Sequence, residues 1–158
     1  MIRNPVTPEG YTALVAELKR QKEIVRPSIV RDIEEARAHG DISENSEYED
    51  AKERQAMCEG RILHLEGQVA SAEVIDISKL PVKDKVVFGA TVDIENVDSG
   101  DTRTWRIVGE DESDVEGGSI SFKSPLGRAL IGLREGDEAV VPAPSGKQLW
   151  EIVAVRYK

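Results

Sequence analysis

The chain has 158 residues, which is enough for one domain or two small ones, and its formal net charge is −9. Both halves are acidic, with 11 Lys and Arg against 16 Asp and Glu in residues 1–79, and 10 against 14 in residues 80–158. Such a chain lacks the bulk basicity of a duplex-DNA binder, so contact with nucleic acid must be local or made through a partner.

The sequence carries no sign of export or membrane insertion. The first residues lack the apolar run of a signal peptide, and no stretch approaches the roughly 20 apolar residues of a membrane span. The single cysteine, Cys58, permits no intramolecular disulfide and favours a reducing compartment. We therefore expect a cytoplasmic protein with no membrane partner. We also expect a monomer.

The first long helix is predicted to start at Pro8, a residue suited to the first helical position. Thr7 should cap it, and Glu9 should face the positive end of the helix dipole. The helix should run to Ala38, and Pro27 should bend it without ending it, because the apolar pattern resumes afterwards. The expected buried face consists of Tyr11, Leu14, Leu18, Val25, Ile29, Ile33 and Ala36.

A second helix should begin near Ser46, which with Glu49 could form a capping box. Gly60 and Gly67 fall outside its apolar seam and each cost about 1 kcal/mol relative to Ala. Because the connection is short, we expect the helices to pair antiparallel as a coiled-coil hairpin, with residues 39–48 as its tip. The expected a/d seam consists of Tyr48, Ala51, Gln55, Cys58, Ile62, Leu65, Val69 and Ala72.

After Asp76 the apolar period changes to that of β-strands separated by turn residues. Residues 79–85, which contain Pro81, are the expected linker. The sequence thus predicts an α+β protein, with a coiled-coil hairpin in residues 1–79 and a compact antiparallel β domain in residues 80–158. Strands are expected at 86–88, 90–94, 104–108, 119–122, 139–141 and 150–155, with a short helix over 128–133.

The tip concentrates negative charge, since residues 41–53 hold six acids against one Lys and no Arg. The ordinary interpretation is a solvated turn followed by a helix start that favours negative charge. Asp41 and Glu44 differ from the other acids because they lie in the chain reversal itself. Two carboxylates there could share a hard cation such as Mg²⁺, but a partner's ligands would have to complete its octahedral shell.

Several other residues are candidates for contacts near the tip. Arg37 and Lys52 flank it from the two helices, either as ordinary salt-bridge partners or as contacts to an RNA phosphate. His39 is more typical of a surface or turn residue than of a catalyst. Cys58 lies on the seam and is more typical of a buried, inert thiol than of a nucleophile.

A loop in the second half mixes turn residues with apolar ones. Ser124, Pro125 and Leu126 predict a loop that leads into a core helix, with Leu130 and Ile131 in the core. Pro125 and Leu126 could instead form an exposed docking knob. The sequence contains no Gly-rich phosphate loop, no Ser nucleophile elbow and no zinc-ligand set.

An ordered set of short segments is more specific than any one of them. These segments are 36–41 (Ala-Arg-Ala-His-Gly-Asp), Glu44-Asn45, Glu47-Tyr48, 58–62 (Cys-Glu-Gly-Arg-Ile), 72–76 (Ala-Glu-Val-Ile-Asp), 88–92 (Phe-Gly-Ala-Thr-Val) and 124–127 (Ser-Pro-Leu-Gly). Together they resemble the bacterial GreA/GreB family of transcript cleavage factors, and the GreA type more closely. The resemblance covers essentially the whole chain.

This resemblance implies an N-terminal antiparallel coiled coil and a C-terminal FKBP-like β domain. It implies that the partner is RNA polymerase, with the β domain at the rim of the secondary channel and the coiled coil inside it. It further implies a factor that is not itself an enzyme. The factor would stimulate the polymerase's own cleavage of a backtracked RNA 3′ end and so rescue arrested complexes.

The resemblance also implies roles for individual residues. Asp41 and Glu44 would help seat a second Mg²⁺ in the polymerase active site and orient the attacking water. Arg37 and Lys52 would help hold the extruded RNA, and Ser124, Pro125 and Leu126 would contact polymerase. Position 43, often basic in GreA-type tips, is Ser43 here, which could weaken contact with RNA or the channel wall.

Three alternatives remain open. A Gre-like inhibitor would occupy the same channel without cleavage, although the pair formed by Asp41 and Glu44 argues against it. A prolyl isomerase would need a pocket rich in aromatic residues, and the second half has few. A coiled-coil adaptor without chemistry predicts that Asp41→Ala has no effect.

Overall fold

The computed structural model describes residues 3–40, 45–81 and 84–157. It forms two compact units, one made of Tyr11–Ala72 and the other combining Arg3–Gly10 with Glu73–Lys158. The predicted α+β class is confirmed, because the first unit is helical and the second contains a β-sheet. The sequence ranges 1–79 and 80–158 stay predictions of the domain boundary. Over the described residues, none of the helices combines the length and hydrophobicity needed to cross a bilayer.

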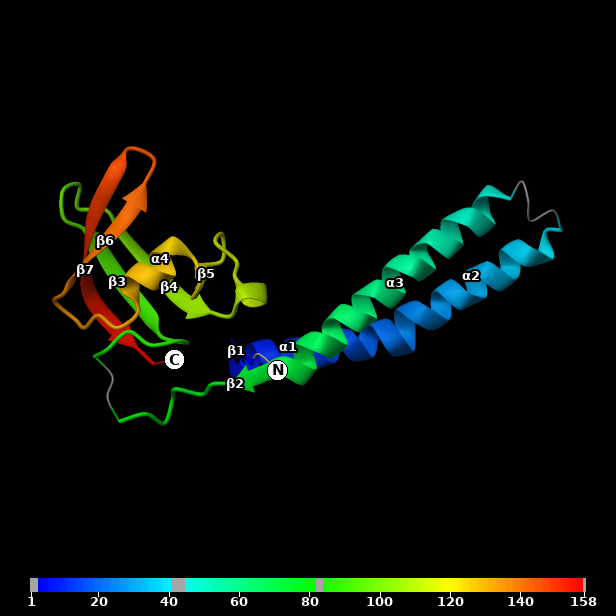
Figure 1. Ribbon diagram of the computed structural model, residues 1–158, viewed down its shortest axis with the longest axis horizontal. Coiled ribbons are helices and arrows are strands. Elements are labelled where there is room, and N and C mark those ends of the chain that lie inside the picture. Colours follow the sequence, from blue (N-terminus) through cyan, green and yellow to red (C-terminus); the bar gives the residue numbers. More distant parts are fainter. Residues whose placement is uncertain (1–2, 41–44, 82–83, 158) are drawn as a thin grey trace. The chain divides into compact units, whose positions relative to one another are not determined.

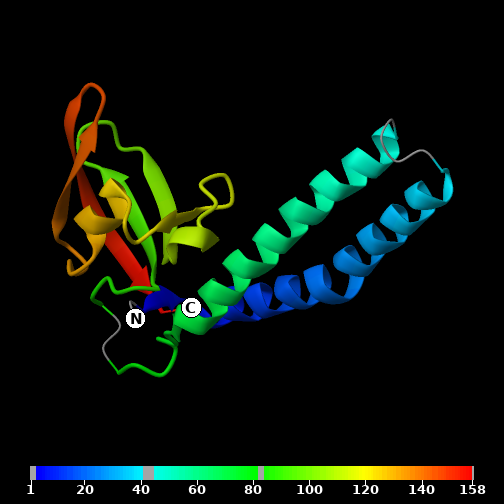
Figure 2. The same ribbon diagram turned by 45° about the vertical axis from the view of Figure 1, so that its right-hand side comes forward.

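The first unit is a helical hairpin (Figure 1). One arm consists of α1 (Pro8–Arg20), the π-helical η1 (Gln21–Val25) and α2 (Arg26–Ala38), and the other is α3 (Ser46–Ser71). Three ion pairs show that the arms are antiparallel, because the residue number on α3 falls as the residue number on the first arm rises. They are Lys22–Glu66 at 3.4 Å, Arg26–Glu59 at 2.8 Å and Asp32–Arg54 at 3.0 Å. Figure 2 shows α2 and α3 side by side.

The hairpin is held by the apolar seam that the sequence predicts. Ile29, Ile33, Ala51, Cys58 and Ile62 form one buried cluster. The other predicted seam positions are also buried or half-buried, so both predicted faces are confirmed. Most of the helical stability in such a hairpin comes from this packing rather than from helix propensity.

The helical arm continues through Pro27, as expected, but it contains a π-helical turn that the sequence analysis did not predict. Gln21, Val25, Ile29 and Ile33 are buried or half-buried at successive steps of four. In an α-helix each step of four rotates the side chain by about 40° away from a fixed line, because each residue turns about 100°. The π-helical turn has i→i+5 hydrogen bonds and therefore more residues per turn than an α-helix. It counters this rotation and keeps the four side chains on the seam. Pro27 also lacks the amide that an unbroken α-helix would use there.

Gln21 is a buried polar residue on the seam, 8% exposed. Its Nε2 donates to Glu17 Oε1 at 2.9 Å, and its Oε1 accepts from Cys58 Sγ at 3.5 Å. Both polar ends of the amide are therefore satisfied, which removes the main cost of burying it. Cys58 is a buried free thiol, as predicted.

The helix α3 is capped by a different residue from the one predicted. Asn45, not Ser46, is the N-cap, and its Oδ1 accepts from Tyr48 N at 3.1 Å. Its Nδ2 donates to the carbonyl oxygen of Ala36, near the end of α2, at 2.6 Å. The Ser46–Glu49 box was wrong because Asn45 satisfies both helix ends at once, which a serine side chain is too short to do. Asn45 therefore ties the two arms together beside the tip.

Replacement of this residue gives the first prediction. Asn45→Ala should lower the free energy of unfolding of the hairpin by about 1–2 kcal/mol, because it removes a helix cap and a cross-link between the arms. Urea unfolding followed by far-UV circular dichroism measures the change. Ser46→Ala is the matched control and should change stability by less than about 0.5 kcal/mol. Equal effects of the two substitutions would show that Asn45 is not the cap.

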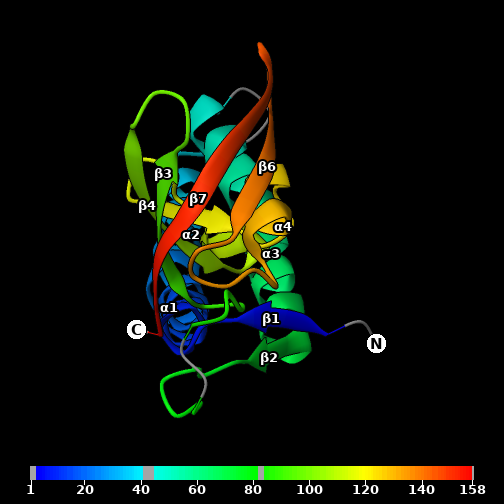
Figure 3. The same ribbon diagram turned by 90° about the vertical axis from the view of Figure 1, so that its left-hand side faces the viewer.

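The second unit is built on a five-stranded sheet of order β5-β4-β3-β7-β6, and Figure 3 shows β4, β3, β7 and β6 across it. All strand pairs are antiparallel except β4 with β5, which is parallel and was not expected. The predicted strand at Val86–Phe88 is wrong: Val86 bonds through its backbone to Gly132 and Leu133 outside the named strands. The strands are β3 (Thr91–Asn96), β4 (Thr102–Val108), β5 (Ser119–Ser121), β6 (Glu138–Ala143) and β7 (Gly146–Arg156).

One helix, α4 (Pro125–Leu130), packs on the sheet and starts three residues before the predicted 128–133. Leu130 is fully buried with Val92, Ile107 and Ile152, whereas Ile131, expected in the core, is 37% exposed because the helix has already ended. The aromatic residues of this unit mostly serve the core. Trp105, Phe122, Trp150 and Tyr157 belong to it or pack on it, and Phe88 meets Phe122 edge-on with ring centroids 5.6 Å apart.

The first residues of the chain belong to this second unit. The short strand β1 (Asn4–Val6) pairs with β2 (Ala72–Val74), as Figure 3 shows. Thr7 caps α1 by accepting from Gly10 N at 3.0 Å, as predicted.

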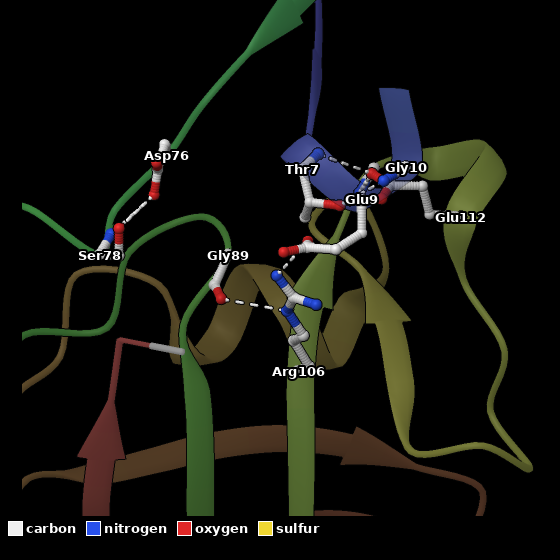
Figure 4. A network of polar contacts seen from close by, with 9 residues as sticks. Thr7, Glu9, Gly10, Asp76, Ser78, Gly89, Arg106 and Glu112 are labelled. Atoms are coloured by element: carbon white, nitrogen blue, oxygen red, sulfur yellow. Dashed lines mark hydrogen bonds and ion pairs between the residues drawn. The ribbon is translucent and has the colours of Figure 1, made fainter. Parts of the chain in front are cut away.

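A carboxylate from the β4–β5 connection meets this cap (Figure 4). Glu112, in the 3₁₀ helix η3 (Glu110–Glu112), accepts from the amide of Thr7 at 3.1 Å and from its hydroxyl. It also accepts from Gly109 N at 2.9 Å. Arg106 ties β4 to the same segment by donating to Glu9 Oε2 at 2.9 Å, and it also donates to Gly89 O at 3.4 Å. The bonds to Glu112 satisfy the amide and the hydroxyl of Thr7, which is only 1% exposed.

The outer face of the sheet carries two contrasting charge arrangements. Asp93 on β3 accepts hydrogen bonds from Arg156 on β7 and from Thr104 on β4 at 2.6 Å. The Arg156 guanidinium, followed by the Thr104 hydroxyl, holds the pKa of Asp93 below its ordinary value. By contrast, Glu95, Glu151 and Glu138 stand directly opposite one another on β3, β7 and β6.

The pKa of Asp93 gives the second prediction. Because the folded-state pKa is lowered, the pair stabilises the fold above the ordinary Asp value of 3.8, and this contribution is lost as the pH falls through the folded-state pKa. Asp93→Asn should therefore cost about 1 kcal/mol at neutral pH, a value reduced for partial exposure, and progressively less in acid. Urea unfolding followed by tryptophan fluorescence reports on this unit alone, since both tryptophans, Trp105 and Trp150, lie in it.

Asp98→Asn is the control, because Asp98 is an exposed residue of the β3–β4 turn. It should leave stability nearly unchanged at every pH. If Asp93→Asn and the unchanged protein differed in free energy of unfolding by the same amount at neutral and acid pH, the electrostatic explanation would be contradicted.

Candidate functional site

The predicted site has its centre at Asp41 and Glu44, which lie outside the described residues, as does Ser43. The structure does describe what holds that segment at both ends. The helix α2 ends at Ala38 and α3 begins at Ser46, so seven residues join two antiparallel, packed arms. Asn45 bonds to both arms, and His39 Nδ1 lies 3.4 Å from Glu47 Oε2. The two carboxylates therefore belong to a short connection with fixed ends.

The two predicted basic residues flank this connection, one on each arm. The Arg37 guanidinium lies 5.9 Å from the ring centroid of Tyr48, a cation–π contact across the arms. Lys52 Nζ donates to Gln55 Oε1 at 3.1 Å. Within the described part of the chain neither residue forms an ion pair, and both are exposed. Their charges are therefore not neutralised by the described acids.

The described acids of the tip and the start of α3 are exposed, as the ordinary interpretation expects. Glu47 and Glu49 lie in the first turn of α3, where the helix dipole favours negative charge. Asp50 pairs with Arg54 at 3.2 Å. Across residues 3–40, 45–81 and 84–157, no three His, Cys, Asp or Glu residues gather closely enough to hold a metal ion. That search does not extend to Asp41 and Glu44.

The predicted docking residues begin α4 and differ from one another in their surroundings. Ser124 caps the helix by accepting from Gly127 N at 3.0 Å and donates to Ser121 O at 2.7 Å. Leu126 is half-buried and packs on the core, so it is not an exposed knob. Pro125, at the start of the helix, is exposed. Of the three residues, Pro125 is thus the one whose side chain is available to a partner without loss of a core contact or a cap.

Sequence reasoning missed Asn45 as the residue that fixes the ends of the tip. The signal was present, because Asn is a favoured N-cap and immediately precedes the apolar periodicity. Ser46 offered a competing signal through the spacing of Ser46 and Glu49. Only the bond to Ala36, on the other arm, separates the two possibilities.

The comparisons with known proteins agree with this architecture. Residues 4–74 match the family model for the N-terminal part of the transcription elongation factors, and residues 81–157 match the model described as transcription elongation factor, GreA/GreB, C-term. Transcription elongation factor GreA of Hyphomonas neptunium is 56% identical over 158 residues, which is the whole of both chains. The chain belongs to the GreA/GreB family of transcription elongation factors.

Other relatives extend the comparison. GreA of Francisella tularensis subsp. novicida is 51% identical over 156 residues, covering 99% of this chain and 98% of its own. The crystal structure of GreA factor homolog 1 from Thermus thermophilus is 28% identical, with a TM-score of 0.44 and coverage of 97% of this chain and 98% of its own. The sequence relatives therefore decide membership of the GreA/GreB family.

Proposed function

We propose that the protein stimulates the cleavage of backtracked RNA by RNA polymerase and so rescues arrested elongation complexes. The observation that carries this proposal is the 56% identity to a GreA over the full length of both chains. In this proposal the protein is not itself an enzyme. It enters the secondary channel with its hairpin and contributes side chains to the polymerase's own active site.

The hairpin supports the proposal by its construction. Packed, antiparallel arms with a buried seam resist bending, and Asn45 fixes the ends of the connection that contains Asp41 and Glu44. Fixed ends limit the positions available to the two carboxylates. Such restriction is the physical origin of catalysis by positioning, since reacting groups lose less entropy when they meet.

The donor chemistry of the tip fits Mg²⁺, because carboxylate oxygens are hard ligands and two of them leave room for ligands from polymerase and water. Asp41 and Glu44 would hold the ion, and when bound it would supply charge stabilisation and a more acidic water. Independently of the ion, either carboxylate can accept a hydrogen bond from the attacking water and orient it. Arg37 and Lys52 would offset the charge of the RNA phosphate.

The central prediction concerns the two carboxylates. Asp41→Asn and Glu44→Gln should each lower stimulated RNA cleavage about 100-fold or more, the usual contribution of a positioned general base or water-orienting group. Cleavage is measured on purified, arrested elongation complexes with Mg²⁺, and binding to polymerase is measured separately and should persist.

Glu53→Gln is the matched control, because Glu53 is an exposed acid of α3 outside the connection. It should stimulate cleavage normally. Normal cleavage by Asp41→Asn and Glu44→Gln would refute the mechanism and favour an adaptor. Failure of the unchanged protein to stimulate cleavage while it binds polymerase would favour a secondary-channel inhibitor.

A further prediction concerns docking through the start of α4. Pro125→Glu should weaken binding to polymerase about 10-fold, or about 1.4 kcal/mol, because it places a charge on the exposed residue of the proposed contact. The helix should keep its fold, since an acid is tolerated in the first helical turn. Val97→Glu, at a 48% exposed apolar residue of the β3–β4 turn, is the control and should bind normally. An affinity of Pro125→Glu equal to that of the control would exclude this contact.

A further inference from the structure

One flank of the hairpin contains a groove that the proposed chemistry at the tip does not use. It lies between η1 with the start of α2 on one side and α3 on the other, and its volume is about 470 Å³. Val25 and Ile29 belong to its lining from the first arm, and Cys58 from the second. All lining residues belong to the first unit.

Two large apolar side chains of the lining remain in solvent. Ile24 of η1 is 63% exposed, and Met57 of α3 is 70% exposed. Isolated exposed apolar residues are ordinary, but two that line the same groove from opposite arms form a ready-made contact for another apolar group. The π-helical turn contributes to this arrangement, because it keeps Val25 and Ile29 on the seam while Ile24 faces the groove.

The charged residues that line the groove are basic. Arg54 and Arg61 are its only charged lining residues, although the net charge of the protein is −9. Arg54 is already paired with Asp32 and Asp50. Arg61 has no such ion pair in the described part of the chain, and it makes only a small contribution to lowering the pKa of Glu17 to about 2, behind Arg20 and Gln21. Arg61 is thus the cation that remains available to a partner.

We propose that this groove docks an acidic amphipathic helix of a partner protein. Arg61 would pair with a carboxylate of that helix, whereas Arg54 would keep its ion pairs with Asp32 and Asp50 at the edge of the groove. Apolar residues of that helix would cover Ile24 and Met57, as in other complexes that place a helix in a groove. Single-stranded RNA fits less well, because none of the lining residues offers an aromatic ring for base stacking.

The identity of the partner rests on the proposed function, under which the hairpin enters RNA polymerase. The helix would then be one of the polymerase. The groove would contribute affinity and leave the chemistry at the tip unchanged. This division allows the groove and the tip to be tested separately.

The test compares four single variants for binding to purified polymerase. Met57→Glu and Arg61→Glu place negative charge in the groove and should each weaken binding at least 10-fold. Leu63→Glu and Arg31→Glu are matched controls, since Leu63 is 74% exposed on α3, Arg31 is exposed on α2, and neither lines the groove. Circular dichroism should show that all four variants keep their helices, because each replaced side chain is exposed or lies at the rim.

Cleavage at saturating factor separates this inference from the proposed function. There, the control variant Leu63→Glu should cleave at the unchanged rate, whereas Asp41→Asn should not, although Asp41→Asn should bind polymerase as tightly as the unchanged protein. Equal affinities for the groove variants and their controls would overturn the groove proposal and leave the function intact. If the unchanged protein binds polymerase without stimulating cleavage, the function fails while the groove can still be judged by affinity.

A photo-crosslinking amino acid in place of Met57 identifies the occupant. A crosslink to an acidic helical segment of polymerase, located by mass spectrometry, would support the proposal. A crosslink to RNA, or to a basic or non-helical segment, would overturn it.

Discussion

Burial of one apolar seam between two antiparallel arms is the constraint on which the rest of the hairpin depends. Near the tip the buried seam positions include Ala36 and Ala51, which are 2% and 0% exposed. There the carbonyl of Ala36 accepts a hydrogen bond from the Asn45 side chain. Larger residues, Ile62 and Leu65, fill the seam farther from the tip. The packed seam and the Asn45 bond together hold the two ends of the short connection.

The sequence was sufficient to predict the hairpin, because an apolar period of three and four is a local signal repeated over many residues. It was insufficient to predict the structure around a polar side chain whose hydrogen-bond partner is far away in the sequence. Gln21 can be buried because its side-chain amide forms hydrogen bonds with Glu17 and Cys58. The π-helical turn keeps seam residues that are four positions apart on one side of the helical arm. Asn45 and Ser46 are both good N-caps, and the arm opposite decides between them.

The second unit shows the same limit. Alternation predicted β3, β4 and β7, but the parallel pairing of β4 with β5 depends on residues that no local pattern connects. The three-residue strands β1 and β2 are too short to show a period at all. At the site, residue type and spacing were enough to single out Asp41 and Glu44, and their roles stay predictions. In the sequence, Ser124, Pro125 and Leu126 read as one loop motif. The structure shows that Ser124 caps a helix, Pro125 is exposed and Leu126 is half-buried.

The row formed by Glu95, Glu151 and Glu138 ends at β6, the terminal strand of the sheet order. Like charges directly opposite one another on neighbouring strands are destabilising, so this row of glutamates lowers the stability of the fold. An incoming strand of a second molecule would meet that repulsion before it could extend the sheet, and Pro142 denies it one backbone donor. Pairing of β6 with a strand of another molecule is therefore disfavoured, even in a crowded solution.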